Sequence, residues 1–492
     1  MVDIVTLVAG VDSSTQSTKI EVRDLDTGDV VGSGSSPHPA VTAPCSEQDP
    51  ATWWSAFLAA WATVGSPDIA AISIGGQQHG MVAVDELGNA VHPAKLWNDT
   101  ESAADSSALI GQLGGPDRFV EAVGSVPVAA FTITKLAWLQ RTRPDAWQRV
   151  ARVMLPHDYL TARLTGALTP GHPLSAAGLP PITTDRGDAS GTGYWSPAGG
   201  EYRWDLLEMI DAGRDWKQTV PTVLGPLEAA GTWTSKTTGN ATTSNDPIVG
   251  PGTGDNMAGA LGLGLGPGDT VISIGTSGTV YAVSNTPTAD ATGAVAGFAD
   301  ASGRFLPLVC TSNASKVLDA VRRLLDVDHT EFDRLALAAE PGGPVLLPYL
   351  DGERTPNRPD ATGLLAGIRS DITREQFARA AVDGVACGLL DGVDALQSLT
   401  ELGGRVLLTG GGARSAALQQ VIAGLIDSPV VVSAADEAVA TGAAVQAAAV
   451  LEQVDVAVIQ DRWNLGAGTP VEASTVAVDA SLRERYAALR DT

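Results

Sequence analysis

The chain has 492 residues, of which 44% are apolar and 18% are charged, and its formal net charge is −25. This length exceeds what one hydrophobic core normally supports, so two or three domains are expected. The apolar fraction excludes a disordered chain, and 56 acidic against 31 basic residues exclude a general affinity for nucleic acids or anionic membranes. Any phosphate must therefore be bound locally, by backbone N–H groups, helix N-termini or a bridging cation.

Three isolated cysteines, Cys45, Cys310 and Cys387, form no CxxC pair and have no close histidine spacing. This favours a reducing compartment over a disulfide framework or a zinc site. The N-terminal segment lacks the basic flank and long apolar run of a signal peptide, because Asp3 and Asp12 bracket it. We therefore expect a soluble protein of the cytoplasm.

The most apolar long stretch, residues 430–451, is interrupted by Asp436 and Glu437 and is rich in alanine. A membrane span needs about 20 consecutive apolar residues without such charges. The stretch therefore predicts a strand followed by a buried helix, and no membrane partner is expected.

The first 35 residues predict strands joined by short turns: an apolar run at 4–11, the turn "DSSTQS", the alternating run "TKIEVRD", the turn "DTGD" and then "VVGSG". Asp49 followed by Pro50 predicts a helix start. The helix that follows has apolar positions at helical spacing, and its tryptophans are expected in the core: Trp53, Trp54 and Trp61. Next, "AAISIGG" predicts a strand that leads into "QQHGM".

Near residue 270 the opening pattern returns, since "DTVISIGTSGTVYAVS" is again a strand, a short hydroxyl-rich turn and a strand. This predicts that the second half begins with the same supersecondary unit, as in a duplicated domain. Residues 236–254 are rich in Thr, Ser, Gly, Asn and Pro, so we expect a boundary there, with one domain at 1–256 and another at 257–492.

Later segments alternate between strand and helix. "RVLLTGGGARSAALQQVIAGLI" predicts a strand at 405–409, a glycine turn and a helix from about residue 415, and "VVVS" predicts a strand before an alanine-rich helix that starts at Asp436. Such alternation is typical of α/β layers.

Three turns rich in glycine or hydroxyl groups follow apolar strands, at residues 11–18, 274–279 and 409–415. They would expose backbone N–H groups to phosphate oxygens, although each alone is also typical of a plain hairpin or connection. No lysine follows a glycine as in a Walker A loop, "GLGLGPGD" breaks the dinucleotide pattern, and no histidine pair has metal spacing. These absences disfavour P-loop enzymes, standard dehydrogenases and zinc hydrolases.

The stretch "GPGTGDNMAG", residues 250–259, places Asp255 and Asn256 at the end of a bare glycine loop. Asp255 could cap a helix that begins at Met257. Alternatively, the glycines allow a substrate to approach closely and Asp255 acts on it.

A second polar group follows the strand "AAISIGG". His79 lies beside glycines, where its ring could face a cleft or serve as a hydrogen-bonded structural histidine. Gln77, Gln78 and the segment "LWND" at residues 96–99 add amides, an indole and a carboxylate suited to a polyhydroxylated ligand.

Taken in order, these motifs resemble the FGGY family of carbohydrate kinases, closest to its xylulokinase branch, over nearly the whole chain. The matching segments are "GVDSSTQSTK", "GGQQHGMVAVD", "PAKLWNDTES", "DASGTGYWSP", "GTGDNMAGALG", "SIGTSGTV", "LPYLDGERTPNRPDATG", "LTGGGARS" and the signature "GLLAGIRSDITREQFARAAVD" at residues 363–383. Departures from the family pattern are Ala130 in "FTITKLAWLQR", Ser13 and Ser14 in the first turn, and Glu101 after "WND".

The resemblance implies an actin-like ATPase (ribonuclease H-like) α/β fold, with two duplicated domains flanking a cleft where ATP and a ketose meet. The implied reaction is ATP-dependent phosphorylation of D-xylulose to D-xylulose 5-phosphate with Mg²⁺. The implied catalytic residues are Asp255, as base, and Asp12, which would orient Mg²⁺ directly or through water. The implied ATP-binding residues are Ser14, Thr15, Lys19, Gly275, Thr276, Ser277, Gly411, Gly412 and Ala413. The residues expected to hold the ketose are Gln78, His79, Trp97, Asp99, Asp255 and Asn256.

Other functions stay open at this point. A sister kinase of the same fold would act on ribulose, a pentitol, glycerol or gluconate, and "QQHG" is the feature that leans toward xylulose. A catalytically silent sugar or nucleotide sensor is disfavoured by the intact Asp255 and the three turns. Nucleic-acid partners are not expected, and a homodimer is left open.

Overall fold

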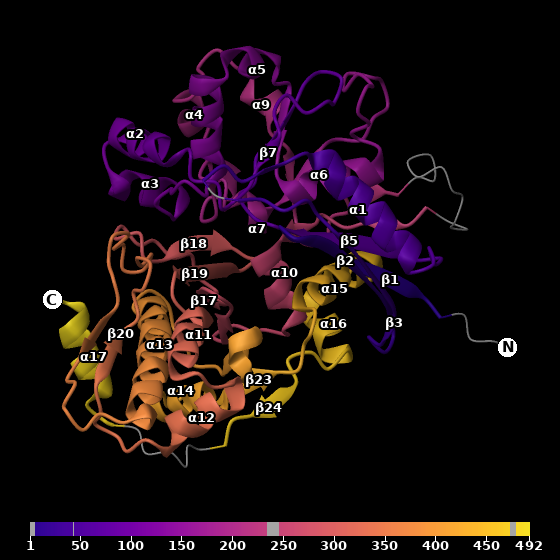
Figure 1. Ribbon diagram of the computed structural model, residues 1–492. Coiled ribbons are helices and arrows are strands. Elements are labelled where there is room, and N and C mark those ends of the chain that lie inside the picture. Colours follow the sequence, from indigo (N-terminus) through magenta and orange to yellow (C-terminus); the bar gives the residue numbers. More distant parts are fainter. Residues whose placement is uncertain (1–4, 43, 234–245, 473–478) are drawn as a thin grey trace. The chain divides into compact units, whose positions relative to one another are not determined.

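The computed structural model describes residues 5–42, 44–233, 246–472 and 479–492. They fall into two units (Figure 1). Unit 1 contains the residues up to Leu265 together with Gly297–Phe305 and Ala435–Gly466, and unit 2 contains Gly266–Ala296, Leu306–Ala434 and the residues from Ala467 onward. The domain boundary at residues 256 and 257 stays a prediction, and residues 236–245 of the expected boundary segment lie outside the described residues.

Unit 1 is built on a sheet with the strand order β13-β14-β5-β1-β2-β3, and β15 also pairs with β5. The strands of unit 1, including those outside this sheet, are β1 (Leu7–Ser13), β2 (Ser17–Asp24), β3 (Val30–Pro37), β4 (Glu47–Gln48), β5 (Ala71–Gly76), β6 (Val82–Val84), β7 (Ala94–Lys95), β8 (Arg152–Met154), β9 (Thr183–Asp185), β10 (Trp195–Ser196), β11 (Glu201–Tyr202), β12 (Thr222–Leu224), β13 (Gly231–Thr232), β14 (Ile248–Val249) and β15 (Thr253–Gly254). The two predicted hairpins and the strand "AAISIGG" are thereby confirmed.

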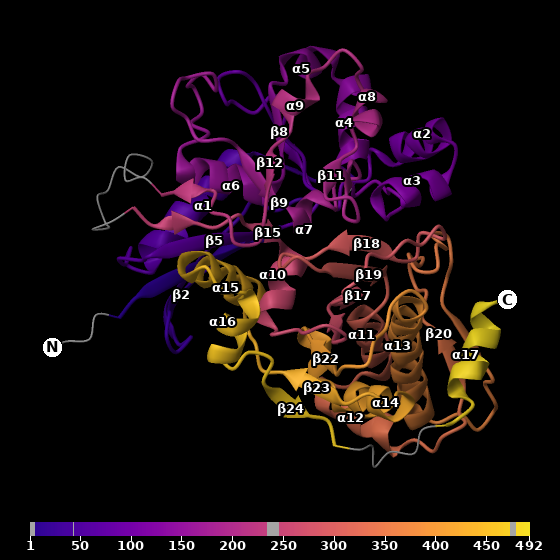
Figure 2. The same ribbon diagram turned by 180° about the vertical axis from the view of Figure 1, so that it is seen from behind.

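Helices cover both faces of this sheet. The helices of unit 1 are α1 (Pro50–Thr63), α2 (Ala103–Leu113), α3 (Pro116–Val123), α4 (Thr132–Thr142), α5 (Pro144–Arg149), α6 (Pro156–Thr165), α7 (Arg186–Ala189), α8 (Trp204–Glu208), α9 (Trp216–Thr219), α10 (Asp255–Gly262), α15 (Ala438–Glu452) and α16 (Val456–Arg462). Figures 1 and 2 show α1 and α6 on one face of the sheet and α10 and α15 on the other.

Helix α1 starts as predicted, because the Asp49 side chain accepts a hydrogen bond from the Ala51 N–H at 2.9 Å and Pro50 occupies the first turn. Such a cap stabilises a helix by about 1 kcal/mol. The three tryptophans of this helix region, Trp53, Trp54 and Trp61, are buried in the core of unit 1, as expected.

Unit 2 contains a second sheet in which β19-β17-β16-β22-β23-β24 are neighbours. Its strands are β16 (Thr270–Ile274), β17 (Gly278–Ala282), β19 (Phe305–Thr311), β20 (Val345–Leu347), β21 (Leu364–Ala366), β22 (Val406–Thr409), β23 (Val430–Ser433) and β24 (Gly468–Pro470), while β18 (Ala296–Ala299) begins at the end of the first unit 2 segment. Its helices are α11 (Ser315–Leu325), α12 (His329–Ala338), α13 (Arg374–Gln397), the 3₁₀ helix η2 (Gly411–Arg414), α14 (Ala416–Leu425) and α17 (Leu482–Arg490).

The predicted duplication is visible in the strand order. In unit 1 the strands β3-β2-β1-β5-β14 have two antiparallel and then two parallel pairings, and β19-β17-β16-β22-β23 in unit 2 repeat that pattern. The pairs β1-β2 and β16-β17 are the hairpins with a hydroxyl-rich turn. The two halves of the chain are therefore built on the same supersecondary unit.

The 363–383 signature has a local explanation in α13. The Thr373 side chain accepts from the Gln376 N–H, and the Gln376 side chain accepts from the Thr373 N–H, which forms a capping box. Arg379 and Asp383 form a buried ion pair at 2.6 Å one turn further along the helix.

Residues 430–451 form strand β23 and the buried helix α15, as predicted. Within the described residues, no single helix is long and apolar enough to cross a membrane. Helices α15 and α16 reach that length and composition only as a pair, and the chain bends by 115° between them.

Candidate active site

The first hairpin brings Asp12 and Lys19 opposite each other on β1 and β2. The turn between the strands closes because the Ser14 N–H and the Ser14 hydroxyl both donate to the Ser17 carbonyl, at 3.0 and 3.1 Å. Small hydroxyl residues in a tight turn make such bonds readily. The turn is therefore held by its own residues and presents Asp12 at the end of a buried strand.

Asp12 is 8% exposed, and its Oδ1 has no hydrogen-bond partner among the described residues. Burial, followed by the nearby charge of Asp255, raises the pKa of Asp12 to about 7. A buried carboxylate oxygen without a protein donor is costly unless a cation or proton satisfies it. This oxygen fits a ligand of Mg²⁺, which prefers carboxylate oxygens.

Lys19 forms an ion pair with Glu437. Its Nζ lies 2.8 Å from both carboxylate oxygens of Glu437, which immediately precedes α15, and both side chains are partly exposed. A phosphate-binding role for Lys19 would require this pair to open, and that role stays a prediction.

A chain of side-chain hydrogen bonds links the hairpin turn to the strand end of β5. The Trp97 indole donates to the Thr15 hydroxyl at 3.0 Å, and that hydroxyl donates to Gln77 Oε1 at 3.0 Å. Trp97 is 42% exposed, so part of its side chain is accessible to a ligand. Thr15 therefore joins the turn to two of the polar segments singled out in the sequence.

Gln78, His79, Asp255 and Asn256 come together in unit 1. Asn256 Nδ2 donates to Gln78 Oε1 at 2.7 Å, and Gln78 Nε2 is buried without a partner among the described residues. A Cβ at residue 254 would lie 2.6 Å from Gln78 Cγ, so the glycine there allows this side chain to lie against the loop. The group offers amide hydrogen bonds of the kind that hydroxyls of a sugar accept and donate.

His79 has a left-handed backbone with φ of 64°. Its ring stacks on Phe131 with a centroid distance of 5.0 Å, and its Nδ1 lies 2.7 Å from the Gly191 carbonyl oxygen. Non-glycine residues in this conformation are uncommon and are often found at functional sites. These contacts fix the ring and meet the structural role considered from the sequence.

The expectation that Asp255 caps a helix beginning at Met257 is wrong. Helix α10 begins at Asp255 itself, and Gly254 is the residue at the N-cap position. The Asp255 carboxylate accepts from the Asn256 backbone N–H at 2.8 Å and from Asn256 Nδ2 at 3.0 Å. The helix starts earlier because Thr253 and Gly254 pair with the end of β5, and the helix follows this short strand without an intervening loop.

Burial raises the pKa of Asp255 to about 6, and the hydrogen bond from the Asn256 N–H opposes that rise. A carboxylate with a pKa near 6 is ionised at neutral pH and is a stronger base than an exposed one. Its place in the first turn of α10 also favours the ionised form, through the helix dipole. The group is therefore suited to accept a proton from a hydroxyl.

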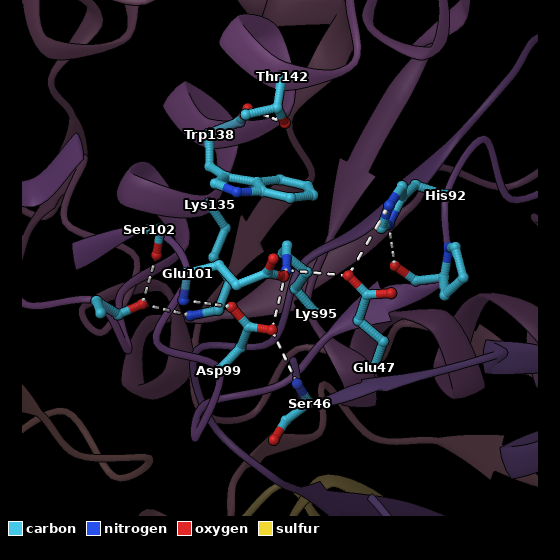
Figure 3. Close-up of polar contacts among 12 residues, drawn as sticks. Ser46, Glu47, His92, Lys95, Asp99, Glu101, Ser102, Lys135, Trp138 and Thr142 are labelled. Atoms are coloured by element: carbon cyan, nitrogen blue, oxygen red, sulfur yellow. Dashed lines mark hydrogen bonds and ion pairs between the residues drawn. The ribbon is translucent and has the colours of Figure 1, made fainter. Parts of the chain in front are cut away.

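Asp99 has a different environment from the other candidates (Figure 3). It is fully buried, and its Oδ2 accepts from Lys95 Nζ and from the Ser46 N–H, both at 2.9 Å. Lys95 Nζ also lies 2.7 Å from Glu101 and 3.0 Å from Glu47, beneath the ring of Trp138 at 3.9 Å. A direct ketose contact by Asp99 stays a prediction, because its oxygens hold the loop that carries Trp97.

The same region brings four potential metal ligands within 4.8 Å of one another: Cys45, Glu47, Asp99 and Glu101. The Lys95 ammonium already supplies the positive charge among the three carboxylates. Glu101, the departure from the family pattern, is thereby explained as a partner of Lys95. All three cysteines are free thiols.

Unit 2 contains a cavity of about 620 Å³ beside its own hairpin and the glycine turn. Of the residues expected to bind ATP, Gly275, Thr276, Gly411 and Gly412 line it. Ser277 lies exposed in the same turn, and the Ala413 side chain is buried in the core of unit 2. Sequence reasoning missed further lining residues, including Arg322, His329, Phe332 and Asp333, which come from α11 and α12 without a motif.

Comparison with known proteins identifies the family of the chain. Residues 7–262 match the N-terminal domain, and residues 270–451 the C-terminal domain, of the FGGY family of carbohydrate kinases. The chain is 46% identical to the xylulose kinase of Streptomyces coelicolor and 47% identical to that of Streptomyces rubiginosus, in each case over 95% of this chain and 92% of the relative.

Among solved structures, the fold is similar to xylulose kinase from Bifidobacterium adolescentis, with a TM-score of 0.88, 41% identity and 99% of each chain covered. Plasmodium falciparum glycerol kinase with ADP shares the fold at a TM-score of 0.85 and 18% identity, over 99% of this chain and 97% of that one. The predicted actin-like ATPase fold is confirmed. Both FGGY domain models match this chain, and its fold is that of a solved xylulose kinase structure. The chain therefore belongs to the FGGY family of carbohydrate kinases.

Proposed function

We propose that this chain is a xylulokinase that transfers the γ-phosphoryl group of ATP to D-xylulose and forms D-xylulose 5-phosphate. The observation that carries the proposal is the half-buried Asp255 carboxylate, which lies beside the amides of Asn256 and Gln78 in a member of a carbohydrate kinase family. Xylulose kinases at 46% and 47% identity support the choice of ketose.

In this proposal the residues of unit 1 hold the ketose and accept its proton. Gln78, His79 and Asn256 contact the ketose hydroxyls, and Trp97 covers part of the sugar. Asp255 takes the proton of the attacking hydroxyl as the new O–P bond forms and the bond to ADP breaks. Phosphoryl transfer needs little more from a protein than this positioning and charge stabilisation.

Asp12 and the first turn act on the phosphate side. Asp12 Oδ1, which has no hydrogen-bond partner in the described part of the chain, would hold Mg²⁺, directly or through water. Ser14, Thr15 and Lys19 would contact phosphate oxygens. When bound, Mg²⁺ would neutralise charge on the transferring phosphate. The net charge of −25 makes such a cation useful, because the chain has no general excess of basic groups.

ATP binds, in this proposal, through the unit 2 cavity, the Gly275–Ser277 turn and the Gly411–Ala413 turn. Backbone N–H groups of such turns bind phosphate oxygens without a charged side chain. We also propose a cytoplasmic location, where ATP is available. The homodimer and the lack of nucleic-acid or membrane partners stay predictions.

A coupled ADP-release assay over ribulose, xylulose, pentitols, glycerol and gluconate tests the proposal. We expect D-xylulose to give the highest kcat/KM, by at least about tenfold, because fixed hydrogen-bond partners discriminate strongly among hydroxyl patterns. A higher kcat/KM for another substrate would make this chain a sister kinase. No substrate-dependent ADP release with any of them would favour the sensor.

The nucleotide side is tested by Gly411→Val. A Cβ at residue 411 meets no atom of the described residues within 4 Å, so the fold should tolerate the change, whereas the added side chain would enter the cavity. We expect the KM for ATP to rise about tenfold or more and the KM for xylulose to change less than about twofold. Gly403→Val, at another position with open space around it, is the matched control. Unchanged ATP affinity in the Gly411 variant would contradict the assignment.

A further inference from the structure

A buried cluster of four ionisable side chains lies in unit 1: His157, Asp158, Asp185 and Asp188. Each is at most 2% exposed. His157 Nε2 lies 3.1 Å from Asp158, 3.4 Å from Asp188 and 3.8 Å from Asp185. The proposed reaction uses none of these groups, although Asp188 opens the family-like motif "DASGTGYWSP".

Burial suppresses the charge of the cluster, more strongly at Asp158, Asp188 and His157 than at Asp185. Burial raises the pKa values of Asp158 and Asp188 well above their ordinary value and that of Asp185 to about 6, and it lowers the pKa of His157 to about 3. Protonated carboxyl groups and a neutral imidazole can be buried at much lower cost than the corresponding ions. The cluster can therefore serve as an internal support for the segments that it contacts.

One of those segments carries the proposed base. The Thr253 hydroxyl donates to Asp185 Oδ2 at 2.7 Å, and both groups are buried. Thr253 lies two residues before Asp255 in the glycine loop. The same Asp185 carboxylate caps α7 by accepting from the Gly187 and Asp188 N–H groups at 2.8 and 2.9 Å. The loop is thus attached to a side chain whose own position is fixed.

The preceding residue fits closely against the cluster. Gly252 has φ of +76°, and a Cβ there would lie 2.5 Å from His157 Nδ1. Its carbonyl accepts from Gln446 Nε2 of α15 at 3.0 Å. The backbone of the loop is therefore confined on both sides before it reaches Asp255.

The strand end that carries His79 also packs against the cluster. A Cβ at Gly76 would lie 2.9 Å from His157 Cβ, so the glycine there lets the end of β5 approach His157 closely. The charge of Asp255 contributes to the raised pKa of Asp188. One buried cluster therefore supports both the strand end that carries His79 and the loop that carries Asp255.

We infer that Asp185 is a positioning residue for phosphoryl transfer, which acts through the Thr253 hydroxyl to fix the loop that presents Asp255 to the substrate. The inference rests on the proposed function, because it assigns Asp255 the role of base. Displacement of a reacting group by about 1 Å can cost about 10²-fold in rate. The Thr253–Asp185 hydrogen bond is the contact that can be removed with the least disturbance.

The kinetic experiment compares Thr253→Val, which keeps the shape and removes the hydroxyl, with Thr253→Ser, which keeps the hydroxyl. Thr165→Val is the matched control, since Thr165 is a buried threonine whose hydroxyl bonds main-chain carbonyls within α6. We expect Thr253→Val to lower kcat with xylulose about tenfold or more, with the KM for ATP changed less than about twofold. Thr253→Ser should recover most of the rate, and Thr165→Val should keep it.

Amide hydrogen exchange of residues 252–256 gives a second readout that needs no substrate. We expect exchange about tenfold faster in Thr253→Val than in the wild type or the Thr165→Val control. If the wild type phosphorylates no ketose but the exchange follows this pattern, the proposed function fails and the positioning role of Asp185 stands. If the wild type is active and Thr253→Val changes neither rate nor exchange, or if Ser is as damaging as Val, the positioning role is overturned.

Discussion

Replacing Asp255 with Ala is expected to lower kcat for xylulose phosphorylation by about 10² to 10⁴, while ATP affinity stays nearly unchanged. The reason is that Asp255 is the half-buried carboxylate beside the proposed ketose amides, held by Asn256 in the first turn of α10. Steady-state kinetics with a coupled ADP assay, and ATP binding measured by calorimetry, check the two parts. A variant with near-normal kcat would remove Asp255 from the mechanism.

The same carboxylate predicts a pH dependence. Because its pKa is raised to about 6 and the ionised form is the base, kcat of the wild type should fall as pH drops below about 6. Asp255→Asn should lose this acid limb together with most of its activity. An acid limb that persists unchanged in the Asn variant would assign it to another group.

The stability of the fold should depend on pH in the opposite direction from kcat, because protonation of Asp255 lowers kcat but stabilises the folded chain. The pKa of Asp255 in the folded chain lies above its ordinary value of 3.8, so its protonated form is favoured by folding. That contribution is fully present below about pH 4 and is lost as pH rises through about 6. At pH 7 the ionised group costs stability, so Asp255→Asn should raise the free energy of unfolding by on the order of 1–3 kcal/mol, as urea denaturation can measure.

Replacing Asp12 with Asn is expected to raise the Mg²⁺ concentration for half-maximal rate at least about tenfold and to lower kcat about 10²-fold. An amide lacks the negative charge that a hard divalent cation prefers, while the similar shape preserves the buried end of β1. Magnesium titrations of the steady-state rate check this expectation.

Asp29→Asn is the control for Asp12, because Asp29 is an exposed carboxylate in the turn between β2 and β3. It should leave the magnesium dependence unchanged. If Asp12→Asn behaves like this control, Asp12 is only a turn-forming residue at a strand end.

The parts of the fold that depend on neighbouring residues were predictable from the sequence. Alternating and apolar runs located β1, β2 and β5, and the Asp49–Pro50 pair located α1. These signals are local because strand alternation and helix caps are set within a few residues. The repeated hairpin near residue 270 revealed the duplication for the same reason.

The contacts that decide the roles of individual side chains were not predictable in this way. Asp255 was expected two residues outside its helix, because pairing of Thr253 and Gly254 with β5 has no local signal. The partners of Asp99 and Asp185 come from segments 53 and 68 residues away, Ser46 and Thr253. Hydrogen bonds between residues so far apart in the chain produce no periodicity or short motif in the sequence, so they cannot be predicted from local patterns.

Helix α15 also affects how the chain is made. It belongs to unit 1, packs on β1 and β5, and is almost entirely buried, yet it is encoded after most of unit 2. During synthesis, the nascent chain therefore leaves the sheet face that α15 covers exposed until residues 438–452 have emerged from the ribosome. A nascent chain with such an exposed apolar surface is prone to aggregate, and chaperones bind surfaces of this kind. A fragment truncated before residue 435 would keep that exposed face permanently.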